Sequence, residues 1–171
     1  MIIFDNPADS SKLQSARKTT RTSMAVLKSM NPFDPSRIVN YPQLSDMDLA
    51  LRLGRARNAF NSYRHSSFQE RSRLMNRVAS SLRERSRELA EVITREMGKP
   101  LAEAAAEVKK CAWVCEYYAE NAAEFLKDKP VETEAGESRV IFEPLGPVLA
   151  VMPWNFPFWQ VFRCAAPALM A

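Results

Sequence analysis

The feature of this 171-residue chain that most constrains its fold is a short, uncharged apolar run, Val148–Met152. The turn-forming residues Leu145–Pro147 precede the run, and Pro153 closes it. Such a run is typical of a strand buried on both faces, as strands in parallel sheets are. A polar Asn155 follows the end of the predicted strand, and Pro157 suits the first turn of a helix. Ligands of open α/β sheets bind beyond the carboxyl ends of strands, so Asn155 stands where a site would be built.

Three amphipathic helices are predicted upstream of this strand. Ser45 begins the first, and Ser67 with Glu70 three residues later forms a capping box at the start of the second. The second runs over residues 67–97, and we expect Gly98 to end it as a left-handed cap. The third has the most regular period, with a seam of Leu101, Ala104, Val108, Cys111, Cys115, Tyr118, Ala122 and Phe125. Its charged residues fall mostly off that seam, namely Glu103, Glu107, Lys109, Lys110 and Glu116.

A buried strand cannot stand alone, because its N–H and C=O groups need hydrogen-bonding partners. Arg139–Glu143 is a second strand candidate, but residues 1–171 do not clearly supply the remaining neighbours. The pattern therefore predicts an incomplete sheet, independently of any resemblance to known proteins.

The string Pro153–Pro157, read as Pro-Trp-Asn-Phe-Pro, resembles the aldehyde dehydrogenase superfamily, together with Ala165–Leu169 after it and Glu96–Pro100 before it. The similarity extends from about Asn31 to the end, and its pattern is closest to the succinate-semialdehyde dehydrogenase branch. The resemblance implies an α/β fold, in which N-terminal helices precede the first strand–helix unit of a Rossmann-like cofactor domain with an incomplete sheet. It also implies a disordered leader over residues 1–30 and a partial cofactor-binding domain over residues 31–171.

The same resemblance implies a function: oxidation of an aldehyde to a carboxylic acid with NAD or NADP. The family's Glu-Leu-Gly-Gly base and Gly-Gln-x-Cys nucleophile motifs are absent, so we expect a truncated chain that is inactive alone. Val151, Met152, Pro153 and Trp154 resemble the segment that lies against the dinucleotide. The chain has only four glycines and no glycine-rich phosphate loop, so cofactor binding by this fragment would be poor. The full-length form is expected to be a homo-oligomer.

Two side chains are candidate site residues. By resemblance, Asn155 donates a hydrogen bond to the oxyanion formed when a thiolate attacks the aldehyde. The alternative is an asparagine that closes a strand-to-helix turn by bonding nearby backbone. Arg163 lies eight residues later, about two helical turns along. It is either a structural ion-pair partner or, as in the succinate-semialdehyde branch, the group that binds the substrate carboxylate.

The three cysteines and the single histidine suggest no further chemistry. Cys111 and Cys115 fall on an apolar seam and are interpreted as core residues, and Cys164 as packing rather than a nucleophile. His65 lies in a polar turn and is expected to be solvated. No metal site is predicted, because Cys111 and Cys115 lack further ligands nearby. An odd number of cysteines without a secretory signal indicates a reducing, cytoplasmic setting.

Charge and hydropathy exclude two other classes of function. The net charge is +4, of which residues 1–30 carry +3, so no general basic surface indicates nucleic-acid binding. The apolar stretch Leu145–Ala171 contains four prolines and Arg163, which a membrane span would not tolerate. Residues 1–30 are alternatively a mitochondrial presequence. The alternative function is that of a non-catalytic helical interaction or assembly module pairing through the third-helix seam.

Overall fold

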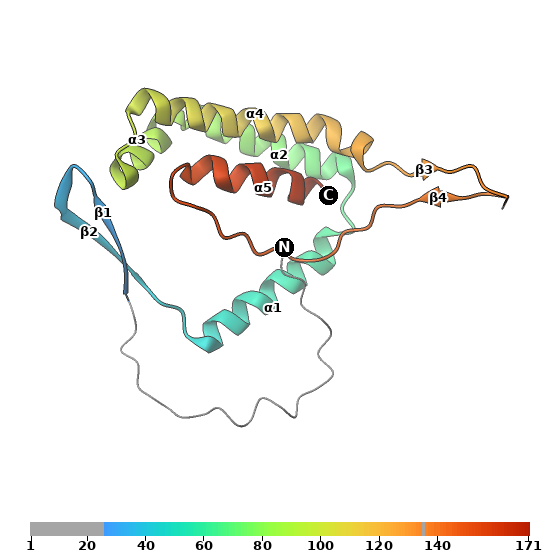
Figure 1. Cartoon of the computed structure of the whole chain (residues 1–171), viewed down its shortest axis with the longest axis horizontal. Helices are drawn as coiled ribbons and strands as arrows, with labels where there is room; N and C mark the ends of the chain where they lie inside the picture. The colour runs from blue at the N-terminus through green and yellow to red at the C-terminus, as the bar shows by residue number, and fades with distance from the viewer. Residues whose placement is uncertain (1–25, 135) are drawn as a thin grey trace.

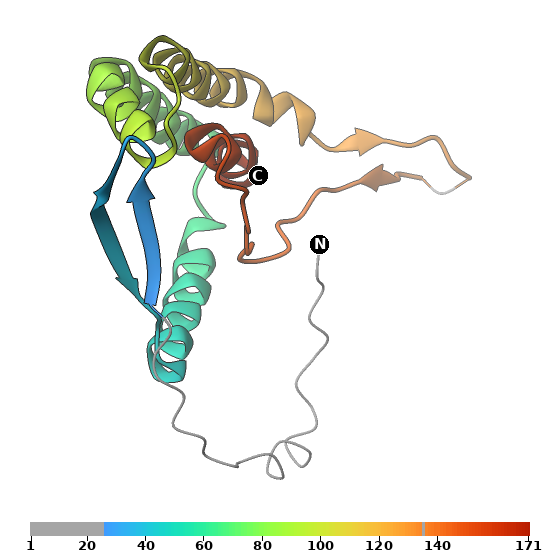
Figure 2. The same ribbon diagram turned by 60° about the vertical axis from the view of Figure 1, so that its left-hand side comes forward.

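The computed structural model describes residues 26–134 and 136–171. Figures 1 and 2 show a body formed by α2, α3, α4 and α5, with the tip of the β1–β2 hairpin beside α3, α1 set apart and the β3–β4 arm projecting. In chain order the elements are β1 (Val26–Asn31), β2 (Asp34–Pro42), α1 (Asp46–Tyr63), α2 (Phe68–Glu84), α3 (Ser86–Met97), α4 (Leu101–Phe125), β3 (Lys129–Pro130), β4 (Arg139–Val140) and α5 (Pro157–Met170).

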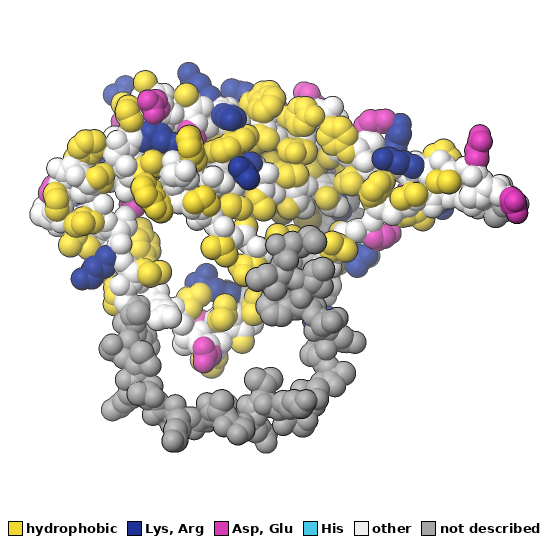
Figure 3. All heavy atoms as spheres, in the orientation of Figure 1, with side chains coloured by type: hydrophobic (Ala, Val, Ile, Leu, Met, Phe, Trp, Pro, Cys, Tyr) yellow, Lys and Arg dark blue, Asp and Glu magenta, His cyan; other side chains and the backbone are white. Residues whose placement is uncertain are grey.

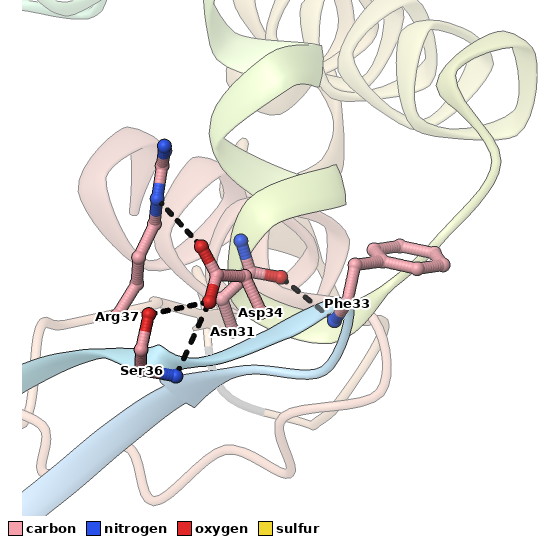
Figure 4. A network of polar contacts seen from close by, with 5 residues as sticks. All are labelled: Asn31, Phe33, Asp34, Ser36 and Arg37. Carbon is pink, nitrogen blue, oxygen red and sulfur yellow. Dashed lines mark hydrogen bonds and ion pairs between the residues drawn. The ribbon is translucent and has the colours of Figure 1, made fainter.

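The β1–β2 hairpin is antiparallel, with Val26 opposite Pro42 and Met30 opposite Ile38. Figure 4 shows the polar network at its tip. The Asp34 carboxylate accepts hydrogen bonds from the Ser36 hydroxyl at 2.6 Å and the Ser36 amide at 3.2 Å, and its other oxygen lies 3.0 Å from Arg37 Nε. The Asn31 side chain accepts from the Phe33 amide at 2.9 Å, so short-range side-chain bonds set the turn.

The predicted leader over residues 1–30 overlaps this hairpin. Val26–Met30 belong to β1 and pair with β2. The pairing with residues 38–42 supplies the backbone partners that a leader would lack. Residues 1–25 of that prediction lie outside the described residues.

Most of the helix signals are confirmed. The Ser45 hydroxyl accepts from the Asp48 amide at 3.1 Å at the start of α1. Ser67 and Glu70 form the expected capping box, with the Glu70 carboxylate 2.7 Å from the Ser67 amide. Gly98 ends α3 at a φ of 76°, the left-handed conformation that favours glycine. Pro157 begins α5 as predicted.

The predicted single helix over residues 67–97 is wrong in one respect. It divides at Arg85, whose φ of −96° and ψ of 14° end α2 before α3 begins. Residues 83–88 are all polar, so no apolar side chain anchors this stretch to the core, and Arg85 instead forms an ion pair with Glu88 at 2.8 Å. The described helices upstream of the site are therefore four, rather than the three expected.

The hydrophobic core lies where α4 packs against α2, α3 and α5. The middle of the predicted α4 seam is fully buried, whereas Leu101 and Phe125 at its ends remain exposed. Figure 3 shows further hydrophobic side chains gathered on the outer face over α4, where Trp113 and Tyr117 are exposed. The core comprises Met75, Ala79, Leu82, Ala90, Ile93, Ala104, Val108, Cys111, Ala112, Val114, Cys115, Ala122, Ala166 and Met170.

Helix α1 buries no residue, although its sequence predicts an apolar face. Phe60 and Tyr63, which belong to that face, line an open apolar cavity of about 860 Å³ between α1, α5 and the segment that precedes α5. The apolar residues of α1 thus face α5 across an open cavity without being buried.

The predicted buried strand Val148–Met152 is not formed. The segment is extended and unpaired within the described residues, and Leu149 and Val151 are 84% and 85% exposed. Among residues 26–134 and 136–171 no strand pairs with it, so its backbone groups lack the partners that burial requires. Of Arg139–Glu143, only Arg139–Val140 pairs, with β3.

The broader expectation of mixed helices and strands with an incomplete sheet is confirmed, because the described strands make two small sheets, β1–β2 and β3–β4. Within residues 26–134 and 136–171, no helix has the length and apolar character needed to cross a bilayer.

Candidate functional site

The turn that carries Asn155 leads directly into α5. Residues 154–156 form this turn, and Phe156 is the last residue before the helix. Asn155 is exposed, and its side chain makes no hydrogen bond to any of the described residues. The turn-closing alternative requires such a bond to nearby backbone, and none is formed here. The amide is therefore uncommitted and accessible.

Asn155 and Arg163 line one cavity of about 520 Å³ between α4 and the start of α5. The structure thus brings the two predicted site residues to the same place. Arg163 is exposed and forms no ion pair with the described residues. The remaining lining residues are Glu103, Ala106, Glu107, Lys110, Phe156, Trp159 and Gln160.

Glu107 holds the first turn of α5. One of its carboxylate oxygens accepts hydrogen bonds from the backbone amides of Phe158 and Trp159, each at 3.0 Å. These amides have no partner within the helix, because the first N–H groups of any helix lack one. Pro157 has no N–H, so this carboxylate serves the next two donors along α5.

Glu107 was grouped with charged residues that fall mostly off the α4 seam, yet it is buried. Its side chain is only 3% exposed, and its second oxygen forms an ion pair with Lys99, whose side chain is 7% exposed. A buried charge is tolerated when a partner of opposite sign and hydrogen bonds compensate it, and both are present here. No periodicity signal distinguishes such a residue from a solvated one, because its partners lie 8, 51 and 52 residues away.

Two lysines pack against the aromatic residues of this turn. Lys99 Nζ lies 3.8 Å from the ring centroid of Phe156, and Lys110 Nζ lies 4.0 Å from that of Trp159. Both are within the range of cation–π attraction. The cavity therefore presents two cations, Lys110 and Arg163, beside the carboxylates of Glu103 and Glu107, and the first free amides of α5 are already bonded to Glu107.

The four residues expected to lie against a dinucleotide do not form one surface. Val151, Pro153 and Trp154 are exposed, whereas Met152 faces the apolar cavity of about 860 Å³. Cys164 lines that cavity too and is half-buried, in keeping with a packing role.

Cys111 and Cys115 are core residues, as predicted. Burial raises the pKa of the Cys111 thiol to about 12 and that of the Cys115 thiol to about 11. His65 is exposed in the turn between α1 and α2, as predicted. Among the described residues, no group of three or more His, Cys, Asp or Glu side chains is placed to hold a metal ion.

Comparison with known proteins matches the chain to aldehyde dehydrogenases. A sequence profile of the aldehyde dehydrogenase family matches residues 19–171. The chain is 45% identical over 145 residues to a probable succinate-semialdehyde dehydrogenase [NADP(+)] of Synechocystis, covering 85% of this chain and 32% of that protein. It is 39% identical over 143 residues to the succinate semialdehyde dehydrogenase [NAD(P)+] Sad of Escherichia coli, covering 84% and 31%.

Solved structures extend the likeness to the fold. Succinic semialdehyde dehydrogenase from Streptococcus pyogenes, in complex with NADP+, matches with a TM-score of 0.79 at 35% identity, covering 84% of this chain and 32% of that one. An aldehyde dehydrogenase from Brucella melitensis matches with a TM-score of 0.79 at 29% identity, covering 86% and 31%. The chain spans about a third of the length of these relatives.

Proposed function

This chain belongs to the aldehyde dehydrogenase family, and from that premise we propose that it carries the oxyanion-binding part of an NAD(P)-dependent enzyme. The reaction is oxidation of succinate semialdehyde, or a similar short semialdehyde, to the carboxylic acid. The observation that carries the proposal is that Asn155, with an uncommitted amide, and Arg163 line one cavity at the start of α5. Residues 31–171 would then form part of the cofactor-binding domain.

Asn155 is proposed to stabilise the charge that develops in the reaction. Attack of a thiolate on the aldehyde carbon places negative charge on the carbonyl oxygen, and the Asn155 amide donates a hydrogen bond to it. One such donor is typically worth about 10²–10³ in rate. Asn155 lies one residue before the N-cap of α5.

Arg163 is proposed to select the substrate. Its guanidinium is exposed, free of ion pairs among the described residues, and shares the cavity with Asn155. A guanidinium binds a carboxylate through two parallel hydrogen bonds. A semialdehyde with a carboxylate at its far end would therefore be held by Arg163 while its carbonyl oxygen meets Asn155.

The residues of this chain fit only part of a dinucleotide. Val151, Pro153 and Trp154 are exposed and could contact a nicotinamide, whereas Met152 lines the apolar cavity instead. None of the glycines forms a phosphate-binding loop, so the phosphates have no cradle among these residues. Bound NAD or NADP accepts a hydride in this chemistry, and the choice between the two is not made by Val151–Trp154.

The 171 residues include neither the Glu-Leu-Gly-Gly nor the Gly-Gln-x-Cys motif, so this chain alone is proposed to be inactive. The nucleophile and base would come from the portion that the relatives have in addition. The same proposal places the enzyme in the cytoplasm, as a homo-oligomer, acting on a small aldehyde and not on nucleic acid or membrane.

The alternative, a helical assembly module that pairs through the α4 seam, is disfavoured. Val108, Cys111 and Cys115 of that seam are fully buried against the chain's own helices. They are not free to meet a partner. Leu101 and Phe125 at the ends of the seam are exposed, and the other large exposed apolar side chains of α4, Trp113 and Tyr117, lie off the seam.

A chimera tests the proposal. Residues 26–171 replace the matching part of the Synechocystis relative, which supplies the remaining two thirds. We expect oxidation of succinate semialdehyde, and Asn155→Ala should lower kcat about 10²–10³-fold with little change in KM. The control is Asn76→Ala, an exposed asparagine on α2. A folded chimera whose kcat survives Asn155→Ala would refute the oxyanion role.

A further inference from the structure

We propose that Glu107, ion-paired with Lys99, is the positioning residue for Asn155. The relevance of this to catalysis rests on the proposed function, but the structural claim stands on its own. Asn155 makes no hydrogen bond within the described residues. Its orientation must therefore come from the residues that follow it, and these are held by the Glu107–Lys99 pair.

The start of α5 is capped by a residue from another helix. Phe156 provides no side-chain cap for the helix, and Pro157 provides no N–H. The Glu107 carboxylate takes the place of the missing cap by accepting from Phe158 and Trp159 at 3.0 Å each. A cap fixes the angle at which the chain enters a helix. The first turn of α5 is thus attached to α4 rather than to its own flanking residues.

The carboxylate of Glu107 is both buried and ion-paired. Its side chain is 3% exposed, and the ammonium of Lys99, 7% exposed, is its ion-pair partner. Hydrogen bonds to a charged acceptor are about twice as strong as those to a neutral one. An anion at a helix N-terminus is further stabilised by the helix dipole.

Lys99 contacts the turn that carries Asn155 directly. Its ammonium lies 3.8 Å from the ring centroid of Phe156, the residue next to Asn155. Lys99 itself is fixed in the corner between α3 and α4, after the left-handed Gly98 and before Pro100. Asn155 is thus followed at positions 156, 158 and 159 by residues that the ion pair holds.

A hydrogen-bond donor for an oxyanion is effective only when its position is set before the reaction. Glu107 touches neither substrate nor reacting atoms in this scheme. It acts through the backbone of α5. The role of the Glu96–Pro100 segment would then be to position the Lys99 ammonium beside Glu107.

Amide NMR of the 171-residue chain tests the inference without any activity. In Glu107→Ala, hydrogen exchange at the Phe158 and Trp159 amides should accelerate about tenfold or more, and the Asn155 amide signals should shift. Glu107→Gln retains an acceptor oxygen, so it should restore part of the protection. The matched control is Glu103→Ala, an exposed glutamate on the same cavity.

The outcomes are separable. Unchanged exchange at Phe158 and Trp159, or unchanged Asn155 signals, in a folded Glu107→Ala chain would overturn the positioning role. If Glu107→Ala does not fold, Glu107→Gln provides the test. The amide proton chemical shifts of Phe158 and Trp159 should then move upfield, because the neutral amide is a weaker acceptor. The amide shift of buried Ile93 should not change. Identical spectra for Glu107→Gln and the parent would also overturn it. None of these results depends on whether Asn155 binds an oxyanion.

Discussion

Arg71 donates a hydrogen bond from Nη1 to the backbone carbonyl oxygen of Met170 at 3.2 Å, which joins the first turn of α2 to the last turn of α5. The same buried guanidinium also donates to the Ser66 hydroxyl and to the carbonyl oxygens of Tyr63 and Arg64. A cation at a helix C-terminus complements the dipole, as the anionic Glu107 does at the other end of α5. This helix is therefore held at both ends by buried charges from the bundle.

We expect Arg71→Met to destabilise the chain by about 2–4 kcal/mol, because four acceptors lose their charged donor in a buried site. Urea unfolding followed by circular dichroism measures the change in the free energy of unfolding. The control is Arg77→Met on the exposed side of α2, which should change it by less than about 0.5 kcal/mol. Equal effects of the two substitutions would contradict the assignment.

Glu107 and Asn155 should be coupled in catalysis. In the chimera, Glu107→Gln should lower kcat for succinate semialdehyde about tenfold while KM changes little. In the Asn155→Ala background the same substitution should have almost no further effect, because its action passes through Asn155. Additive losses in this double-mutant cycle would instead indicate a role in folding alone.

Arg163→Ala should raise KM for succinate semialdehyde about tenfold or more in the chimera, because a bidentate carboxylate contact is lost. The KM for butanal, which has no carboxylate, should change by less than about threefold. Steady-state kinetics with both aldehydes provide the test, with Arg77→Ala as the control. A rise that is the same for both substrates would refute carboxylate recognition.

The thiols should differ in reactivity. Alkylation requires the thiolate, and burial raises the pKa of Cys111 to about 12 and of Cys115 to about 11. Iodoacetamide at pH 8 should therefore modify Cys164, which lines the open apolar cavity, and spare the other two, as mass spectrometry would reveal. All three should react in urea. Modification of Cys111 before Cys164 in the folded chain would contradict the buried placement.

These thiols also predict how stability depends on pH. The folded pKa values lie above the ordinary value of 9.0, so the folded state favours the protonated thiols. Their contribution is fully present below about pH 9 and is lost as the pH rises through the range from about 9 to 12. The urea midpoint of unfolding should decrease between pH 8 and pH 10.5, and this decrease should be smaller in the Cys111→Ala, Cys115→Ala double variant than in the parent.

Gly98 and Gly54 should respond in opposite directions to alanine. Gly98 has a φ of 76°, and a Cβ there would lie 3.0 Å from Pro32 Cγ at the hairpin tip. Gly98→Ala should therefore cost about 1–2 kcal/mol of unfolding free energy. Gly54 lies inside α1 with open space around it, so Gly54→Ala should stabilise by up to about 1 kcal/mol. A neutral Gly98→Ala would show that the left-handed cap is dispensable.

The sequence predicted features that depend on near neighbours. Ser45, Ser67 and Gly98 were identified because caps involve residues within a few positions, and the α4 seam because helical period is local. The division at Arg85 was missed because the apolar stripe resumes after the charged stretch with little change of phase. Glu107 and Arg71 were missed because their partners on α5 lie 51 or more residues away. An apolar run such as Val148–Met152 indicates that the segment favours a buried environment. Burial itself also requires adjacent strands that pair with its backbone.

The contacts of Glu107 at the start of α5 and of Arg71 at its end have a practical consequence for protein engineering. The segment before α5 is exposed and unpaired, so α5 is retained by Glu107, Arg71 and its apolar face rather than by the backbone that leads into it. A chain cut within residues 148–152 should therefore keep α5 docked. The fold is divisible at that point into two complementary pieces, and a graft of the Asn155 turn into another scaffold must take α2 and α4 with it.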